Sequence, residues 1–147
     1  MEKPATDIYT FKKLREGGFT YVDKTGMILP LVVIKALKGF FANIPYDLTD
    51  RQNEQMWQAI VYVVLKAIGV AVFAEVKTNE GRIDMTCETL DAVWLIEFKL
   101  DRSADEALAQ IEKNNYAEKY DLVGKRILKL GISFSSEKRT IVEVKTV

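Results

Sequence analysis

The sequence predicts a mixed α/β domain in which helices pack against a single β-sheet. A length of 147 residues suits one domain, and the content of 48% hydrophobic and 29% charged residues is ordinary for a folded globular chain. Hydrophobic periodicity then gives the order of the main elements, which is a long helix, three strands, a second helix and two further strands. Strands on both sides of a helix are typical of a sheet that is covered by helices.

Two helices are expected before the first strand. A helix over residues 30–42 begins with a proline, which suits the first turn because its missing N–H is not needed there. Thr49 or Asp50 can cap a longer helix over residues 51–68, and Gly69 can end it in a left-handed conformation. Apolar residues at helical spacing predict the side of the long helix that faces the core, namely Met56, Ile60, Val63, Val64 and Ala67.

Three strands are predicted next, over residues 69–78, 81–90 and 91–100, and the first two form a hairpin. The third strand is apolar on both faces, which places it in the centre of the sheet. A capping-box pattern that starts at Ser103 opens a helix to about Tyr120. The two last strands have the sequences RILKLGISF and RTIVEVKTV.

Composition excludes several kinds of catalytic site. The chain has no histidine, which excludes Ser-His and Cys-His catalysis and histidine zinc sites, and Cys87 alone can form neither an intrachain disulfide nor a Cys₄ site. A bound metal must therefore have oxygen ligands, as Mg²⁺, Mn²⁺ and Ca²⁺ do. Lys35 and Lys38 interrupt the apolar stretch 27–44, so we expect no membrane span, and without a visible secretory signal we expect a cytoplasmic protein.

Two acids and a lysine are expected to meet at the end of the central strand. Residues i and i+2 share a face of a strand, so Glu97 and Lys99 lie side by side, and Asp84 shares a face with Arg82 on the preceding strand. If the two faces coincide, Asp84 joins the pair. Buried carboxylates need a partner charge. A divalent cation on the carboxylates, with the lysine orienting or deprotonating the attacking water, would suit phosphodiester hydrolysis.

Simpler interpretations of these residues stay open. The acid-x-Lys triplet occurs three times, close to the number expected by chance, although only Glu97-Phe-Lys99 has an aspartate on the preceding strand and a capped helix after it. Asp84 could simply begin a hairpin, and Glu97 with Lys99 could form a plain ion pair. Glu54 lies where a helix dipole favours any carboxylate. Arg82 is more readily an ion-pair partner of Glu75 or Asp84 than a substrate ligand.

Taken together, these residues resemble the PD-(D/E)XK phosphodiesterase superfamily, and more closely the nuclease-like domain at the C-terminus of bacterial AAA-ATPase-like proteins. The resemblance spans residues 37–147 and rests on Glu54, residues 81–84 and 97–99, and the helix residues 107–111 with Tyr116. It implies a restriction-endonuclease-like α/β fold, a mixed sheet flanked by helices. It further implies Mg²⁺ or Mn²⁺ bound at Asp84 and Glu97 and a catalytic Lys99, with supporting roles for Glu54, Gln110 and Arg82.

Residues 11–15 and 21–25 resemble the opening segment of the ATPase domain in the same proteins. No G-x-x-x-x-G-K-[ST] motif follows, so we expect no ATP binding. The expected organisation is an N-terminal arm, 1–29, and a nuclease-like domain, 30–147. The expected activity is metal-dependent cleavage of nucleic acid, DNA rather than RNA. The alternatives are a catalytically inactive module that binds nucleic acid or protein, which the zero net charge favours slightly, and a homodimer formed through the arm or helix 30–42.

Overall fold

A computed structural model describes residue 32, residues 36–49 and residues 52–147 of the chain. Its elements follow the predicted order and include two short 3₁₀ helices, η1 and η2: η1 (Tyr46–Thr49), α3 (Glu54–Ala67), β1 (Ala71–Lys77), β2 (Arg82–Glu88), β3 (Ala92–Leu100), α4 (Ala104–Lys113), η2 (Tyr116–Tyr120), β4 (Arg126–Ser135) and β5 (Thr140–Thr146). The predicted arm, 1–29, lies outside the described residues, and of the predicted helix 30–42 residues 36–42 are helical. No helix in the described ranges is long and apolar enough to cross a membrane.

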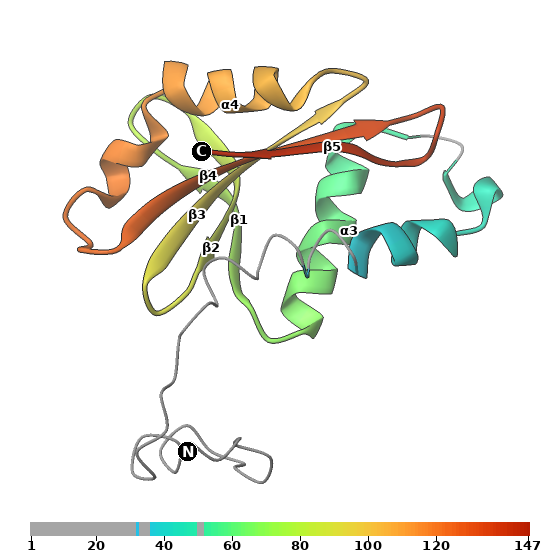
Figure 1. Ribbon diagram of the computed structural model, residues 1–147, viewed down its shortest axis with the longest axis horizontal. Helices are drawn as coiled ribbons and strands as arrows, with labels where there is room; N and C mark the ends of the chain where they lie inside the picture. The colour runs from blue at the N-terminus through green and yellow to red at the C-terminus, as the bar shows by residue number, and fades with distance from the viewer. Residues whose placement is uncertain (1–31, 33–35, 50–51) are drawn as a thin grey trace, which may run out of the picture.

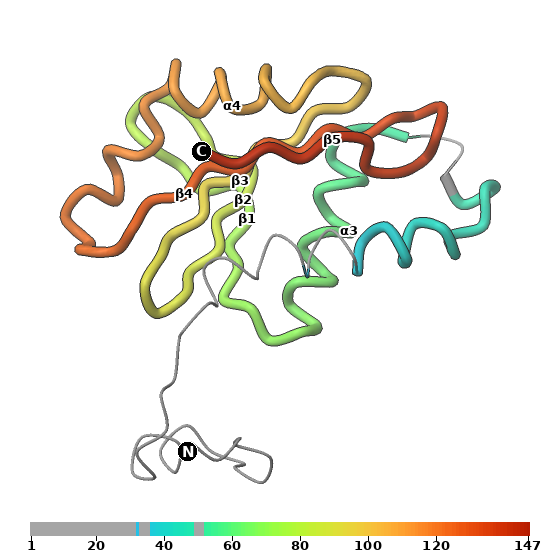
Figure 2. Tube along the Cα trace, in the orientation of Figure 1, coloured from blue at the N-terminus to red at the C-terminus, as the bar shows by residue number. Residues whose placement is uncertain are grey.

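The five strands form one mixed sheet in the order β1-β2-β3-β4-β5. β3 and β4 are parallel and are connected through α4 and η2, whereas every other neighbouring pair is antiparallel. β3 lies in the middle and is buried along all but its last residue, as its doubly apolar sequence predicts. Helices flank this sheet, so the predicted fold class, a restriction-endonuclease-like α/β domain, is confirmed (Figures 1 and 2).

The two faces of the sheet carry separate hydrophobic cores. α3 packs on one face, and α4 with η2 packs on the other (Figure 1). Under α3, Trp57 stacks on Phe134 with ring centroids 5.1 Å apart, and Phe41 meets both rings edge to face. Leu37 and Phe41 are buried in this larger core, so the described part of the first helix belongs to the domain. The smaller core, under α4 and η2, contains Ile83, Val93, Leu95, Ile111, Tyr116 and Tyr120.

α3 begins later than the sequence analysis predicts. Its N-cap is Asn53, whose side chain accepts a hydrogen bond of 2.7 Å from the N–H of Met56, so the predicted cap at Thr49 or Asp50 is wrong. Asparagine caps as well as aspartate does. Gln52 lies before the helix and donates a side-chain hydrogen bond of 3.0 Å to the carbonyl of Ser136, which ties the start of α3 to the β4–β5 turn. The predicted end is correct, since Gly69 has a φ of +82°.

The buried side of α3 also differs from the prediction. Trp57, Val61 and Leu65 face the core at intervals of four residues, whereas the predicted Val63 is 63% exposed. Most of the helix circumference is apolar, so periodicity alone does not single out one side. The stacking of Trp57 on Phe134 does, because a large aromatic ring contributes most when it is fully buried. Met56, Ile60 and Val64 are only partly buried against this core.

α4 has the predicted capping box but ends earlier than expected. The Ser103 side chain accepts a hydrogen bond from the N–H of Glu106, and the Glu106 side chain accepts one from the N–H of Ser103. The α-helix stops at Lys113 and not near Tyr120, because Asn115 has a φ of +46°, a left-handed conformation that asparagine tolerates better than most residues. η2 then turns its tyrosines into the smaller core.

Candidate active site

The candidate site lies where β2 separates from β3. The pairing of the two strands ends at Met85 of β2. Beyond that point the N–H of Phe98 is bound by the Asp84 carboxylate at 3.0 Å, and the N–H of Leu100 is bound by the Glu54 carboxylate at 3.2 Å. Alternate N–H groups of a strand point to the same side. Two carboxylates from different elements therefore lie along one edge of the central strand.

A local bend in the β1–β2 hairpin accounts for this separation. Glu75 has a φ of +56°, which is uncommon for a residue other than glycine, and Glu75 and Asp84 are missing from an otherwise continuous register of paired residues. On the far side of the bend, Val76 and Ile83 pack into the core under α4, whereas Met85 packs into the core under α3. The hairpin thus changes sides at Asp84, which leaves its carboxylate at the opening between the strands.

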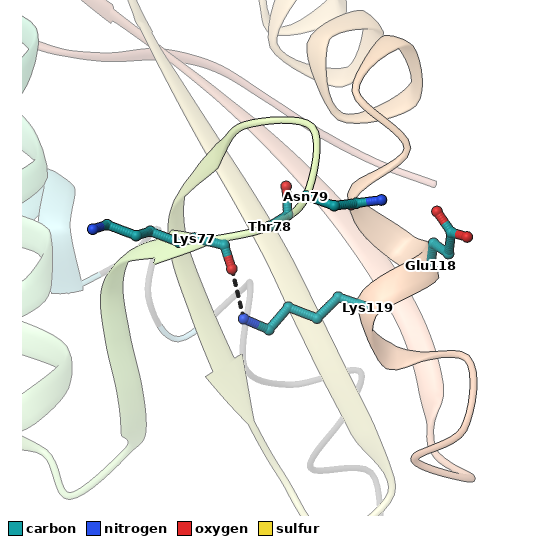
Figure 3. Close-up of a pocket in the computed structure, with 5 residues that line it drawn as sticks. All are labelled: Lys77, Thr78, Asn79, Glu118 and Lys119. Carbon is teal, nitrogen blue, oxygen red and sulfur yellow. Dashed lines mark hydrogen bonds between the residues drawn. The ribbon is translucent and has the colours of Figure 1, made fainter.

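The tip of the hairpin is tied to η2. The ammonium of Lys119 donates a hydrogen bond of 2.7 Å to the carbonyl of Lys77, and the hydroxyl of Tyr116 donates one of 2.7 Å to the carbonyl of Arg82. Figure 3 shows the first of these bonds crossing an open cavity of about 350 Å³, with the Lys77 ammonium pointing away from it. These bonds hold the segment that leads into Asp84.

Buried Glu97 and Lys99 are connected by the partly buried Gln110. The amide nitrogen of Gln110 on α4 donates to Oε1 of Glu97, and its oxygen accepts a hydrogen bond of 2.8 Å from Nζ of Lys99. Nζ of Lys99 also lies 3.6 Å from the same Glu97 oxygen. Glu97 is 1% exposed and Lys99 5%. The second oxygen of Glu97 has no hydrogen-bond partner among the described residues, which is unusual for a buried polar atom.

The two carboxylates at this site are harder to ionise than usual. Burial, followed by repulsion from Asp84, raises the pKa of Glu97 to about 8, although the attraction of Lys99 opposes the shift. Burial also raises the pKa of Asp84, against the opposing hydrogen bond from Phe98 and the charge of Lys99, while repulsion from Glu54 and Glu75 adds to the increase. In the absence of a cation, burial and mutual repulsion therefore disfavour the ionised forms of both carboxyl groups.

These oxygens fit a small divalent cation. Mg²⁺ keeps several waters and is commonly bound through one or two carboxylates. Asp84 and Glu97 supply such a pair, and the unpartnered oxygen of Glu97 is available as a ligand. Within the described ranges, no group of three or more acid or thiol side chains is placed to hold a metal ion. A cation would also favour the ionised forms of both carboxyl groups, whose pKa values are raised by burial and by repulsion.

The structure brings together most of the predicted site residues. Glu97, Lys99 and Gln110 are in contact, and Asp84 and Glu54 lie along the adjacent edge of β3. Arg82 is different, because its exposed guanidinium pairs with Glu75, as the simpler interpretation of Arg82 predicts.

Sequence reasoning missed two residues that shape the site. Glu75 bends the hairpin and raises the pKa of Asp84, yet its triplet looks like a chance match. Glu143 belongs to another of the three acid-x-Lys triplets, Glu143-Val-Lys145, which no helix follows. Its carboxylate accepts a hydrogen bond of 2.8 Å from the N–H of Ala104, and so fixes the start of α4 from β5. No pattern in the local sequence signals either role.

Comparison with known proteins gives a family match and a similar protein. Residues 52–144 match the PD-(D/E)XK nuclease superfamily. The chain is also similar to an uncharacterized protein in the vnfD 5′ region of Azotobacter chroococcum mcd 1, with 35% identity over 133 residues. That alignment covers 81% of this chain and 26% of the relative, so the chain spans about a quarter of the relative's length.

Proposed function

The chain belongs to the PD-(D/E)XK nuclease superfamily, and we propose that it is itself a metal-dependent phosphodiesterase that cleaves nucleic acid, DNA in preference to RNA. Nucleases of this superfamily typically use divalent metal ions. The observation that carries the proposal is the buried pair of Glu97 and Lys99, connected by Gln110, beside the Asp84 carboxylate at the end of the central strand.

Each side chain has a distinct task in this proposal. Asp84 and Glu97 hold Mg²⁺ or Mn²⁺, which supplies positive charge to the phosphate oxygens during cleavage. Lys99 orients the attacking water and takes part in its deprotonation. Gln110 positions the side chains of Lys99 and Glu97, because its amide oxygen bonds to one and its amide nitrogen to the other. It does so without adding a charge to the site. Glu54 supports the end of β3 by binding the N–H of Leu100.

One observation favours a second candidate function. With a pKa of about 8, Glu97 holds a proton near neutral pH unless a cation displaces it. A chain that keeps the proton would retain the fold and the arrangement of these side chains without cleaving. It would then act as a module that binds nucleic acid or a protein partner.

A cleavage assay separates these two functions. We expect the full chain to cleave single- or double-stranded DNA in Mn²⁺, faster than RNA, and to stop when the metal is chelated. Glu97→Gln should slow cleavage by more than about 100-fold, the upper range for loss of a merely supporting residue. Glu80→Gln removes an exposed carboxylate from the hairpin turn and should leave the rate unchanged. Binding without cleavage by the wild-type chain would favour the non-catalytic module.

The wider context of the domain stays a prediction. The resemblance of residues 11–25 to an ATPase segment lies outside the described residues. The relative is longer than this chain, since the aligned part makes up 26% of it. The division at residue 29 and a homodimer formed through the arm or helix 30–42 likewise stay predictions.

A further inference from the structure

A second feature of α4 is a cavity on its solvent-facing side. Its volume is about 380 Å³, and it is lined by Arg102, Glu106, Ala109, Gln110, Lys113 and Asn114. Gln110 is the lining residue whose amide also binds Glu97 and Lys99. The cavity is therefore separated from the buried carboxylate and ammonium by a single side chain.

The charge of this cavity comes from Lys113. Arg102 and Glu106 offset each other, with their side chains 3.2 Å apart, and Glu106 also accepts a hydrogen bond from the N–H of Ser103. Lys113 is exposed and has no ion-pair or hydrogen-bond partner for its ammonium among the described residues. The amide of Asn114 donates to the hydroxyl of Tyr116 and completes the neutral part of the lining.

Three other lysines, near α4 and η2, are already bound. Lys129 pairs with Glu112, Lys145 pairs with Asp105 and Glu143, and Lys119 bonds to the carbonyl of Lys77. Lys113 differs from them in that its ammonium is available, one helical turn beyond Gln110 and on the same side of α4. An available cation beside a phosphodiesterase site suits an anionic group of the substrate.

We propose that this cavity binds a backbone phosphate of the nucleic acid next to the bond that is cleaved, with Lys113 as its cation. The inference rests on the proposed function, because it names the surface by which the same site holds its substrate. The contact would be to the backbone and not to a base, so it would strengthen binding regardless of sequence.

Salt dependence of binding tests this contact directly. We would measure the affinity of the full chain for a single-stranded DNA of about 16 nucleotides, without divalent metal, between about 50 and 200 mM salt. Lys113→Gln should weaken binding at low salt and reduce the magnitude of the slope of log K against log salt by about 0.7, the value expected for one lost phosphate contact to a single strand. Lys113→Arg should keep the slope.

Lys38 provides a matched control. It is also exposed, without a partner for its ammonium among the described residues, but lies in the helix on the α3 side of the sheet, so Lys38→Gln should keep the wild-type slope. An unchanged slope in Lys113→Gln, or no binding by the wild-type chain, would overturn the inference. The metal-dependent cleavage assay is independent of this result. If the wild-type chain cleaves DNA but Lys113→Gln keeps the wild-type salt slope, the phosphate contact alone is rejected. If Lys113→Gln reduces the salt slope but the wild-type chain does not cleave, the nuclease activity alone is rejected.

Discussion

Replacing Lys99 with methionine is expected to slow Mn²⁺-dependent cleavage of DNA by about 10²–10⁴-fold while the chain stays folded. The Lys99 ammonium is buried between Gln110 and Glu97, and no other cation contacts those two side chains in the described part of the chain. Methionine has a similar length, so it fills the same space without the charge. Glu97 loses an attractive neighbour, and its pKa should rise further, which keeps the buried site neutral.

Single-turnover cleavage rates, compared with the far-ultraviolet circular dichroism of the same samples, would measure the effect of Lys99→Met. Lys38→Met removes an exposed lysine from the opposite side of the sheet and serves as the control. A folded Lys99→Met variant that cleaves within about tenfold of the wild-type rate would show that Lys99 does not act on the attacking water.

Gly131→Ala is expected to lower the free energy of unfolding by about 1–3 kcal/mol, the usual cost of overpacking. Gly131 lies on β4 directly beside Glu97 of β3. An added Cβ at this position would collide with the backbone carbonyl of Ala104 and would lie 3.1 Å from Cγ of Leu108 and 3.2 Å from Cβ of Ala107. Because these atoms belong to α4, the helix must move away from the sheet to make space.

Urea unfolding of the metal-free protein would measure this loss. The shift of α4 should also move Gln110 away from Glu97 and Lys99, so cleavage should slow in the same variant. Gly39→Ala is the matched control. Gly39 lies in a helix with no atom within 4 Å of the added Cβ, and the substitution should raise stability by up to about 1 kcal/mol. An unchanged unfolding midpoint in Gly131→Ala would mean that α4 is not seated on Gly131.

Local patterns in the sequence predict the order of the elements and much of the site. The doubly apolar run of β3, the capping box at Ser103 and the glycine at the end of α3 are each signalled within a few residues. Glu97 and Lys99 follow from the alternation of side chains along a strand. These features depend on neighbours in the sequence, so they can be derived without knowledge of the fold.

Local sequence patterns do not predict features that depend on contacts between residues far apart in the chain. The buried side of α3 is determined by the contact of Trp57 with Phe134, which is far away in the sequence. The position of Asp84 depends on the left-handed conformation of Glu75 on the adjacent strand. The cavity at Lys113 lies at the end of α4, beside Gln110, whose amide bonds to Glu97 and Lys99. Scattered lysines in a sequence do not show which of them is left without a partner.

Calorimetric titration of the chain with Mn²⁺ tests the proposed metal site most directly. Near pH 7, Glu97 holds a proton in the absence of metal because its pKa is about 8, so binding should release up to about one proton, and the affinity should fall as the pH is lowered below 8. Asp84→Asn keeps an oxygen that can accept the hydrogen bond from Phe98 but removes the charge. We predict one Mn²⁺ site in the wild-type chain and in Glu80→Gln, and none in Asp84→Asn; equal binding by all three would contradict the assignment of Asp84 and Glu97 as the metal ligands.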